Sequence, residues 1–436
     1  MRRAGRDGGM NILMMTNTYT PLVGGLERSV QEFTAHYRKR GHRTLVVAPA
    51  FEGMPARERD VIRVPAVPHV RGSPFSLQVP IPGVLSKALQ GVQPDIIHAH
   101  HPFLVGSTAL RLATARNLPL VFTHHTLFEH YTHLLPMDSP AVKRFVIRLA
   151  VGYANLCDCV FAPSQSVKEL LERRGVRTPI AVVPTGIHPA RYARGDGRLA
   201  RRKLGIPPDA WVIGHVGRLN PEKNLEFLFR TVALFLHQCE GAHFLLVGDG
   251  ASRAWAQEIF QRWGVADRLH CPGTLQGQPL VEAYHAMDLF AFSSKSETQG
   301  LVLLEAMASG VPVAAVKAPG VVDVVQDGKS GLLLERESVE EFTGLLSRFV
   351  RMSSRKQLAM KEAARARAAE FSMDRCADRA LEIYAQVQIR RRTHRPLAGS
   401  GWARTLRWLG AEWQVFRNYT GAAGAALSGA ETQNSC

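Results

Sequence analysis

The chain has 436 residues, a formal net charge of +17, and 46% hydrophobic and 21% charged residues. This composition excludes a disordered or fibrous chain, and no apolar run approaches the ~20 residues that span a bilayer, which excludes an integral membrane protein. The length predicts two domains or three, and the charge favours a polyanionic partner: nucleic acid, an anionic membrane or a phosphorylated substrate.

The first nine residues form an N-terminal extension with arginines. It lacks the apolar core of ~7 to 15 residues and the cleavage site of a signal peptide, so we expect a cytoplasmic protein. Six cysteines are scattered along the chain, with Cys157 and Cys159 close together. This pattern fits neither a disulfide framework nor a zinc site, so we expect reduced thiols.

From residue 10 onward, short aliphatic runs alternate with longer segments of helical period, the pattern of parallel sheets with crossover helices. The first series of predicted strands comprises residues 11–15, 44–48, 96–99, 119–123, 159–163 and 180–184. The second series comprises residues 211–216, 243–248, 269–271, 288–293, 311–315 and 331–334. The sequence therefore predicts an α/β protein of two doubly wound, Rossmann-like domains facing a cleft.

A polar, basic segment rich in glycine and proline separates the two series and marks the domain boundary. We expect the chain to divide into an extension, a first domain, a linker, a second domain, a C-terminal helix and a tail. These parts are residues 1–9, 10–190, 191–210, 211–370, 371–395 and 396–436.

Ligands of such sheets bind beyond the carboxyl ends of the strands. After the first strand, Gly24 and Gly25 precede a helical pattern, where backbone amides can approach a diphosphate or a sugar. The alternative is a purely structural turn.

Histidines end two predicted strands of the first domain. They are His98, His100, His101, His124 and His125. Histidine at this edge can donate a hydrogen bond or share a proton near neutral pH. Adjacent and alternate residues of a strand point in different directions, so we expect no converging metal site, and core or supporting roles for at least two of these side chains.

In the second domain, Arg218 and Lys223 follow a strand five positions apart. The arginine can grip a pyrophosphate bidentately and the lysine adds a point charge, although a solvated loop is equally consistent.

Glu297 and Glu305 lie eight positions apart around a helix start. We expect Gln299 to line the donor site and the amides of Gly300 and Leu301 to hold phosphate. The two carboxylates accept hydrogen bonds, so their partners would be hydroxyls on either side of a nucleotide sugar's diphosphate. The alternative, two solvated acids, fits Glu305 poorly because it lies in an apolar helix, where an unpartnered charge is costly.

Together these motifs resemble the retaining glycosyltransferases of family 4, which have the GT-B fold, over about residues 10–385. The resemblance implies an acceptor-binding first domain and a nucleotide-sugar-binding second domain. It implies that His125 lies near the reacting sugar, that Arg218 and Lys223 clamp the diphosphate, that Glu297 contacts the donor hexose and that Glu305 binds ribose. The amino-acid sequence around Glu297 and around the histidines is most similar to that of bacterial enzymes that glucosylate diacylglycerol.

The sequence departs from this family at His188, where an acid is usual, a position that is normally capping or structural. There is no D-x-D motif, so we expect a metal-independent reaction without a cofactor, with Arg218, Lys223 and helix amides stabilising the leaving diphosphate. Retention without an obvious nucleophile favours front-side attack, with Glu297 positioning the sugar.

Two segments have basic amphipathic character. Residues 141–161 place Lys143, Arg144 and Arg148 beside apolar residues, which predicts either a lipid-facing surface or a domain helix with a basic outer face. The tail has an apolar stripe with arginines off it. The stripe is Trp402, Leu406, Leu409, Trp413 and Phe416. We expect this stripe to dock on the protein, a partner or, preferentially, an anionic membrane.

The sequence hypothesis is an enzyme on the inner face of the cell membrane that transfers glucose from UDP-glucose to a lipid such as diacylglycerol. One alternative is transfer to a soluble or polyprenyl-linked glycan. A second, a non-enzymatic nucleic-acid-binding protein, is disfavoured because the basic excess is not accompanied by a recognition motif.

Overall fold

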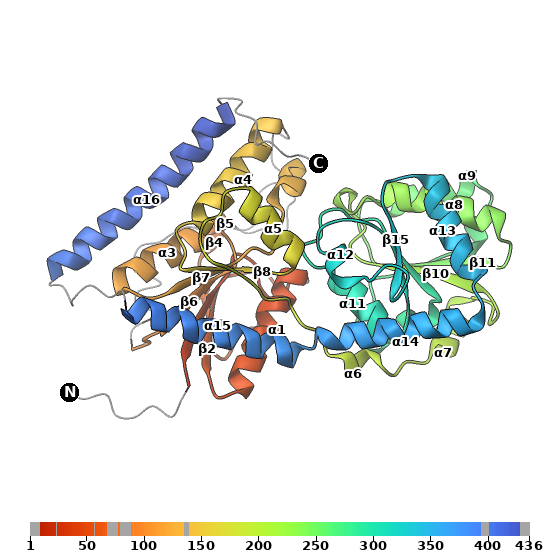
Figure 1. The fold of residues 1–436 in the computed structure, drawn as a ribbon, viewed down its shortest axis with the longest axis horizontal. Coiled ribbons are helices and arrows are strands. Elements are labelled where there is room, and N and C mark those ends of the chain that lie inside the picture. The colour runs from red at the N-terminus through yellow and green to blue at the C-terminus, as the bar shows by residue number, and fades with distance from the viewer. Residues whose placement is uncertain are drawn as a thin grey trace. The chain divides into compact units, whose positions relative to one another are not determined.

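The computed structural model of the chain describes residues 9–22, 24–55, 57–67, 77–78, 89, 91–134, 139–393 and 401–427. The chain forms two compact units (Figure 1). The first consists of residues 1–186 and 373–436, and the second of residues 187–372.

The first unit is built on a parallel sheet in the strand order β3-β2-β1-β6-β7-β8-β9. Its strands are β1 Asn11–Met15, β2 Arg43–Pro49, β3 Val61–Val64, β6 Ile96–Ala99, β7 Leu120–Thr123, β8 Cys159–Ala162 and β9 Ile180–Val182. A short antiparallel pair, β4 Ala66–Val67 and β5 Leu77–Gln78, accompanies it.

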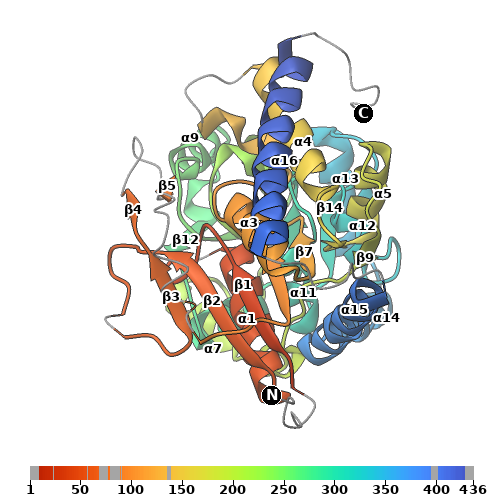
Figure 2. The same ribbon diagram turned by 90° about the vertical axis from the view of Figure 1, so that its left-hand side faces the viewer.

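Helices cover both faces of this sheet (Figure 2). They are α1 Gly25–Lys39, α3 Val105–Arg116, η1 Phe128–Leu134, α4 Pro140–Ala154, α5 Gln165–Arg173, α15 Met373–Thr393 and α16 Gly401–Leu427. The alternation along β1 fixes the faces: Ile12 and Met14 pack with α1 and α15, whereas Leu13 and Met15 pack with α3, α4 and α5. Both faces are buried, which explains why the strands are apolar runs without polar alternation.

The second unit repeats this architecture with a six-stranded parallel sheet in the order β12-β11-β10-β13-β14-β15. Its strands are β10 Trp211–Val216, β11 Ala242–Val247, β12 Leu269–Gly273, β13 Leu289–Phe292, β14 Val313–Val316 and β15 Gly331–Leu334. The helices are α6 Pro189–Tyr192, α7 Gly197–Leu204, η2 Pro221–Lys223, α8 Leu225–Gln238, α9 Arg253–Arg262, η3 Ala266–Arg268, α10 Gln278–Ala286, α11 Leu301–Ala308, α12 Val321–Val324, α13 Val339–Val350 and α14 Ser354–Glu370.

The predicted fold class is confirmed: each unit is a doubly wound parallel sheet. Every predicted strand is present to within two residues at either end, and β3, β4 and β5 are additional. Residues 191–210, predicted as a linker, instead contain the end of α6 and all of α7, and belong to the second unit. Most of residues 371–395 form α15, which returns to the first unit, and the tail forms α16.

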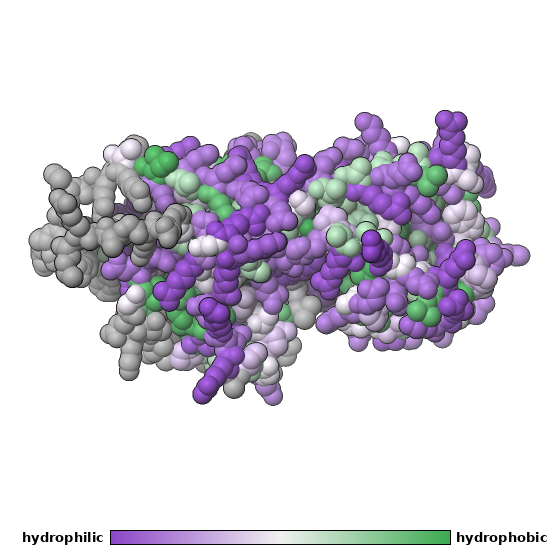
Figure 3. Space-filling view, turned by 90° about the horizontal axis from the view of Figure 1, so that it is seen from below, coloured by the Kyte–Doolittle hydropathy of each residue, from purple (hydrophilic) through white to green (hydrophobic). Residues whose placement is uncertain are grey.

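Within the described part of the chain, no helix is both long and apolar enough to cross a bilayer. On the face shown in Figure 3, hydrophilic side chains predominate and apolar ones gather only in small groups.

Candidate active site

The order of strands reverses between β10 and β13 in the second unit, because the chain extends the sheet outward in opposite directions from these two neighbours. Loops on either side of such a reversal diverge and leave a crevice at the carboxyl ends of the strands. Arg218 and Lys223 follow β10, and Glu297 follows β13. The topology therefore brings three predicted site residues to one crevice.

Lys223 and Glu297 form an ion pair, in which Lys223 Nζ lies 2.5 Å from Glu297 Oε1. Burial alone would raise the pKa of Glu297, but the charge and hydrogen bond of Lys223, the Ser294 hydroxyl and the charge of Arg218 lower it below its ordinary value. Glu297 is therefore an ionised acceptor beside a fixed cation. The site holds one group suited to phosphate and one suited to sugar hydroxyls.

Arg218 is half exposed, with 51% of its side chain accessible, and its guanidinium lies 4.0 Å from the carboxylate of Glu222. The loops after β10 and β13 are joined by Ser293, whose hydroxyl contacts the carbonyls of Lys223 and Asn224 at 3.2 and 2.9 Å. Asn224 has φ +54°, the left-handed conformation that asparagine tolerates, and begins α8. These contacts fix Lys223 against β13 while Arg218 stays accessible.

Gly300 precedes α11 with φ +78°, so the amide of Leu301 opens the helix. Gln299, predicted to line the donor site, is 4% exposed. The loop after β14 packs against this segment at Gly320, where an added Cβ would lie 2.7 Å from the Gln299 nitrogen. The segment before α11 therefore rests against Gly320, a position that has room only for glycine.

Glu305 is 2% exposed. Its Oε1 accepts a hydrogen bond from the Tyr192 hydroxyl at 2.9 Å, and its Oε2 accepts one from the Tyr284 hydroxyl at 2.7 Å. The expectation that this acid has a partner in its apolar helix is met by two tyrosines. A ribose hydroxyl would have to share the same oxygens, so the predicted ribose contact stays a prediction.

Sequence reasoning missed two glycines after β11. An added Cβ at Gly248 would lie 1.8 Å from the Gly217 carbonyl oxygen, and one at Gly250 would lie 2.5 Å from that of Leu219. These glycines let the loop after β11 rest on the loop that carries Arg218. The signal was a Gly-Asp-Gly sequence directly after a strand.

In the first unit, the chain reverses between β1 and β6, and histidines follow β6 and β7. His125 is partly exposed, and its Nε2 lies 2.9 Å from Nδ1 of the buried His100, with the rings stacked 5.1 Å apart. The other ring nitrogen of His100 has no partner among the described residues. His100 therefore fixes the orientation of His125.

The remaining histidines support the fold. His98 Nδ1 is hydrogen-bonded to the Tyr384 hydroxyl of α15, and its Nε2 is hydrogen-bonded to the Thr123 hydroxyl at 2.6 Å. His101 accepts from the Asn17 amide at 3.1 Å. Burial lowers the pKa of His98 and His101 to about 3 and that of His100 and His125 well below the usual range. The cluster is neutral at physiological pH.

His124 lies between the rings of Phe122 and Phe128, and the described residues offer neither of its nitrogens a partner. Burial lowers its pKa to about 4. At least two of the five histidines, as expected, have structural roles.

Gly24 and Gly25 lie at the start of α1 in the first unit, where Gly24 is the N-cap in an extended conformation.

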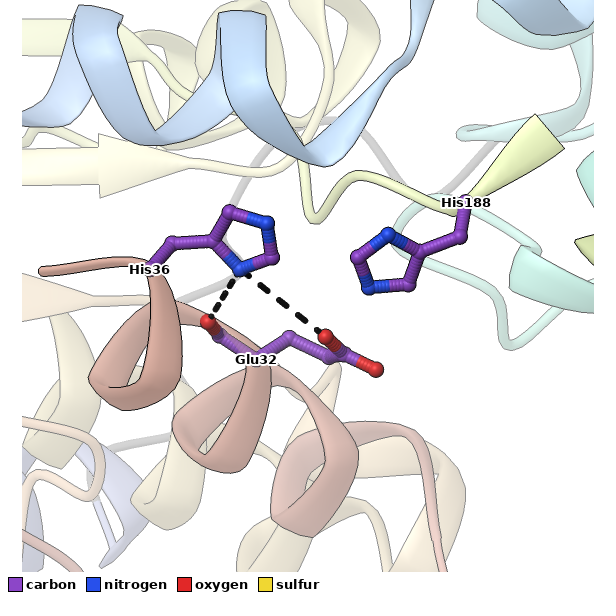
Figure 4. A group of neighbouring side chains, drawn as sticks. All are labelled: Glu32, His36 and His188. Carbon is purple, nitrogen blue, oxygen red and sulfur yellow. Dashed lines mark hydrogen bonds and ion pairs between the residues drawn. The ribbon is translucent and has the colours of Figure 1, made fainter. Parts of the chain in front are cut away.

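One turn apart on α1, His36 Nδ1 lies 2.9 Å from the Glu32 carbonyl oxygen (Figure 4). His188, also drawn there, belongs to the second unit and is the N-cap of α6, without a capping hydrogen bond from its side chain. The imidazole therefore does not replace the cap that an acid would provide.

Two doubly wound units, one with a cation and a carboxylate at its strand reversal and the other with neutral histidines, define a two-domain transferase of the GT-B class. Family models match both units: "Glycosyltransferase Family 4" over residues 23–191 and "Glycosyl transferases group 1" over residues 196–367. The chain belongs to glycosyltransferase family 4 and is an enzyme of that kind.

Curated relatives have several named activities. The alpha-monoglucosyldiacylglycerol synthase of Streptococcus pneumoniae is 29% identical over 74% of this chain and 75% of its own length. The GDP-mannose-dependent alpha-mannosyltransferase of Mycobacterium tuberculosis is 31% identical over 75% of this chain and 84% of its own. Among solved structures, HepE of Anabaena in complex with UDP matches with a TM-score of 0.68 and 24% identity, over 86% of this chain and all of that one. The last likeness shows the fold.

Proposed function

We propose that this glycosyltransferase moves glucose from UDP-glucose to a membrane lipid such as diacylglycerol, with retention of the anomeric configuration. The observation that carries the proposal is the Lys223–Glu297 pair at the strand reversal of the second unit, with Arg218 on the same loop as the lysine. A nucleotide sugar presents anionic phosphates and neutral hydroxyls side by side, and this pair offers a partner for each.

Binding begins with a lysine already in place. Only 14% of the Lys223 side chain is exposed, and its ion pair with Glu297 restricts it, so little side-chain entropy remains to be lost when a phosphate arrives. Arg218 is accessible and closes on the same diphosphate. Glu297 accepts hydrogen bonds from the hexose, and the amides of Gly300 and Leu301 add donors at the helix start.

In the reaction, the bond between the anomeric carbon and the leaving phosphate oxygen breaks. The acceptor oxygen bonds to that carbon from the same face, and the acceptor's proton passes to the departing phosphate. Arg218 and Lys223 stabilise the charge that develops on the phosphate, which makes a metal or cofactor unnecessary. Glu297 holds the hexose and stabilises its positive charge, and neutral His125 supplies a hydrogen bond near the reacting sugar.

The lipid acceptor is supported by the Streptococcus pneumoniae relative, whose name is that of a glucosyldiacylglycerol synthase, and by the basic character of α3, α4 and α16. An enzyme of this kind works on the inner face of the cell membrane as a peripheral protein. A second candidate is mannosyl transfer to a soluble or polyprenyl-linked glycan, with GDP-mannose as the donor that the name of the Mycobacterium tuberculosis relative gives.

The test is a matrix of UDP-glucose, UDP-galactose and GDP-mannose against diacylglycerol and a polyprenyl-linked glycan, with products identified by mass spectrometry and the anomer by NMR. We expect an α-glucosyl diacylglycerol from UDP-glucose. A mannosylated glycan as the main product would overturn this proposal in favour of the second. The Lys223→Ala variant should form product at least about a hundredfold more slowly, whereas Lys295→Ala, which removes an exposed lysine paired with Glu337 at 2.7 Å, should retain activity.

A further inference from the structure

The helix α16 is the outermost element of the first unit. In Figures 1 and 2 it runs along α4 and α3, which lie between it and the sheet. Sequence reasoning expected the tail stripe to dock on the protein, a partner or a membrane. The helix does dock on the protein, but through a different face.

The inner face of α16 makes specific contacts. Glu412 accepts from Arg111 of α3 at 2.6 and 3.0 Å, and Asn418 donates to the Leu149 carbonyl of α4 at 3.1 Å. An added Cβ at Gly152 of α4 would lie 1.7 Å from Asn418 Oδ1. The absence of a side chain at Gly152 thus makes room for Asn418. These specific contacts show that α16 is packed as an integral helix of the first unit.

Further along, Val415 packs against the core beneath α3 and α4, and Ala422 is 2% exposed. Arg144 of α4 donates to the Ala426 carbonyl at 3.1 Å, so α16 runs antiparallel to α4. These positions recur every three or four residues, which gives the helix one inner stripe.

The outer face carries the aromatic residues. Trp413 is 59% exposed and Phe416 is 56% exposed, and their rings lie 5.8 Å apart at 27°. In the sequence, the stripe continues through Trp402, Leu406 and Leu409, whose side chains are outside the described residues. Inner contacts do not explain this pair, because the helix is held by its other side.

The helix that carries this pair and the two helices beneath it are strongly basic. Helices α3, α4 and α16 together contain eight arginine and lysine residues and one acid, Glu412, which is paired with Arg111. The side chains of Lys143, Arg148 and Arg417 are exposed. The sequence predicted that α4 is either a lipid-facing surface or a domain helix with a basic outer face. The helix packs in the first unit as a domain helix, and Lys143 and Arg148 of its basic face remain exposed.

We propose that this outer face, with its exposed Trp413 and Phe416 and the exposed cations that α4 and α16 carry, docks on the headgroup region of an anionic bilayer. Aromatic side chains insert at the interface, and arginine and lysine are attracted to anionic lipids. A second copy of the chain is a poorer occupant, because a twofold contact would oppose two patches of the same charge. The inference names the surface that serves the proposed lipid acceptor and rests on that function.

The test compares the full chain with the Trp413→Ser/Phe416→Ser variant and a matched Ile389→Ser control, which removes a 60% exposed residue on α15. Binding to vesicles of phosphatidylcholine alone, or with phosphatidylglycerol, is measured by cosedimentation, with circular dichroism to check the fold. We expect binding only to the anionic vesicles and an approximately tenfold or larger loss in the double variant. Equal binding of the double variant and the control would overturn the proposal.

Two further readouts separate other outcomes. Equal binding of the parent chain to neutral and anionic vesicles would refute the role of charge. If the parent chain instead forms a dimer that the double variant abolishes, and does not bind vesicles, the occupant of this face is a second copy of the chain. With detergent-dispersed diacylglycerol, the double variant should transfer glucose like the parent, whereas transfer to vesicle-embedded diacylglycerol should fall. If no form glucosylates diacylglycerol while vesicle binding still depends on the aromatic pair, the proposed acceptor fails and the docking surface stands.

Discussion

The two units place opposite chemistry on the same architecture. In each, a parallel sheet reverses its strand order and presents side chains at the carboxyl ends of neighbouring strands. The second unit holds charge there, in Arg218, Lys223 and Glu297, whereas the first holds neutral histidines whose pKa values are lowered by burial. The charged end suits a diphosphate, and the neutral end suits hydroxyls that must be oriented without attracting anions.

The largest effect is expected from removing Lys223, the lysine of the ion pair at the strand reversal of the second unit. Lys223→Ala takes away the proposed phosphate partner and leaves Glu297 ionised and poorly compensated, so kcat/KM should fall by about 10²- to 10³-fold. Steady-state kinetics with varied donor measure it, beside Lys295→Ala. Equal activity of the two variants would show that the charged end does not hold the donor.

A smaller loss is expected when the helix start of the second unit is displaced. At Gly320, φ is +77° and an added Cβ would meet the Gln299 backbone, whereas at Gly328 φ is +72° and nothing lies within 4 Å. Gly320→Ala should raise the donor KM about 10- to 100-fold, while Gly328→Ala carries the same backbone strain without the contact. Similar donor KM values for both would exclude a role for this loop.

In the neutral end, His100 is expected to act by orienting His125. His100→Leu removes the 2.9 Å hydrogen bond and should lower kcat about tenfold with little change in the donor KM. Asparagine places an amide nitrogen near the position of Nδ1, so His100→Asn should restore part of the rate. Failure of the asparagine to do better than leucine would reduce His100 to a packing residue.

The smallest effect concerns stability and pH. The pKa of His124 is lowered by burial to about 4, against 6.5 ordinarily, so the unfolded chain binds this proton below pH 6.5 and the native chain does not until about pH 4. The contribution of neutral His124 to stability is complete above pH 6.5 and is lost as pH falls towards 4. His124→Phe should therefore stabilise the protein by about 2 kcal/mol more at pH 5 than at pH 7. Urea titrations at both values test this, and equal shifts would contradict it.

The sequence predicted the strands well because each is an apolar run between turn residues. It missed β3, whose Val-Ile-Arg-Val sequence contains a charge, and the pairing of β4 with β5, which are only two residues long each. It placed Arg218, Lys223 and Glu297 on the correct loops, because the ends of parallel strands share one edge of the sheet.

Other features depend on contacts that have no local signal. The tyrosines that bind Glu305 lie 113 and 21 residues away, so the sequence could indicate that the acid needs a partner but not which one. The sequence likewise gave no reason to single out His100 among the clustered histidines, because its role depends on its contact with the ring of His125. The inner stripe of α16 is less apolar than its outer stripe, since it is built on Glu412 and Asn418, so hydrophobic periodicity could not indicate the face that packs against α3 and α4.

The return of α15 to the first unit has a consequence for the order in which the protein matures. Tyr384 of α15 forms the hydrogen bond to His98 from 286 residues away, and α1 packs against the same helix. During synthesis, the ribosome releases every residue of the second unit before it releases α15 and α16. The second unit can therefore fold while the nascent chain is still attached, whereas the first unit, although begun first, is completed last.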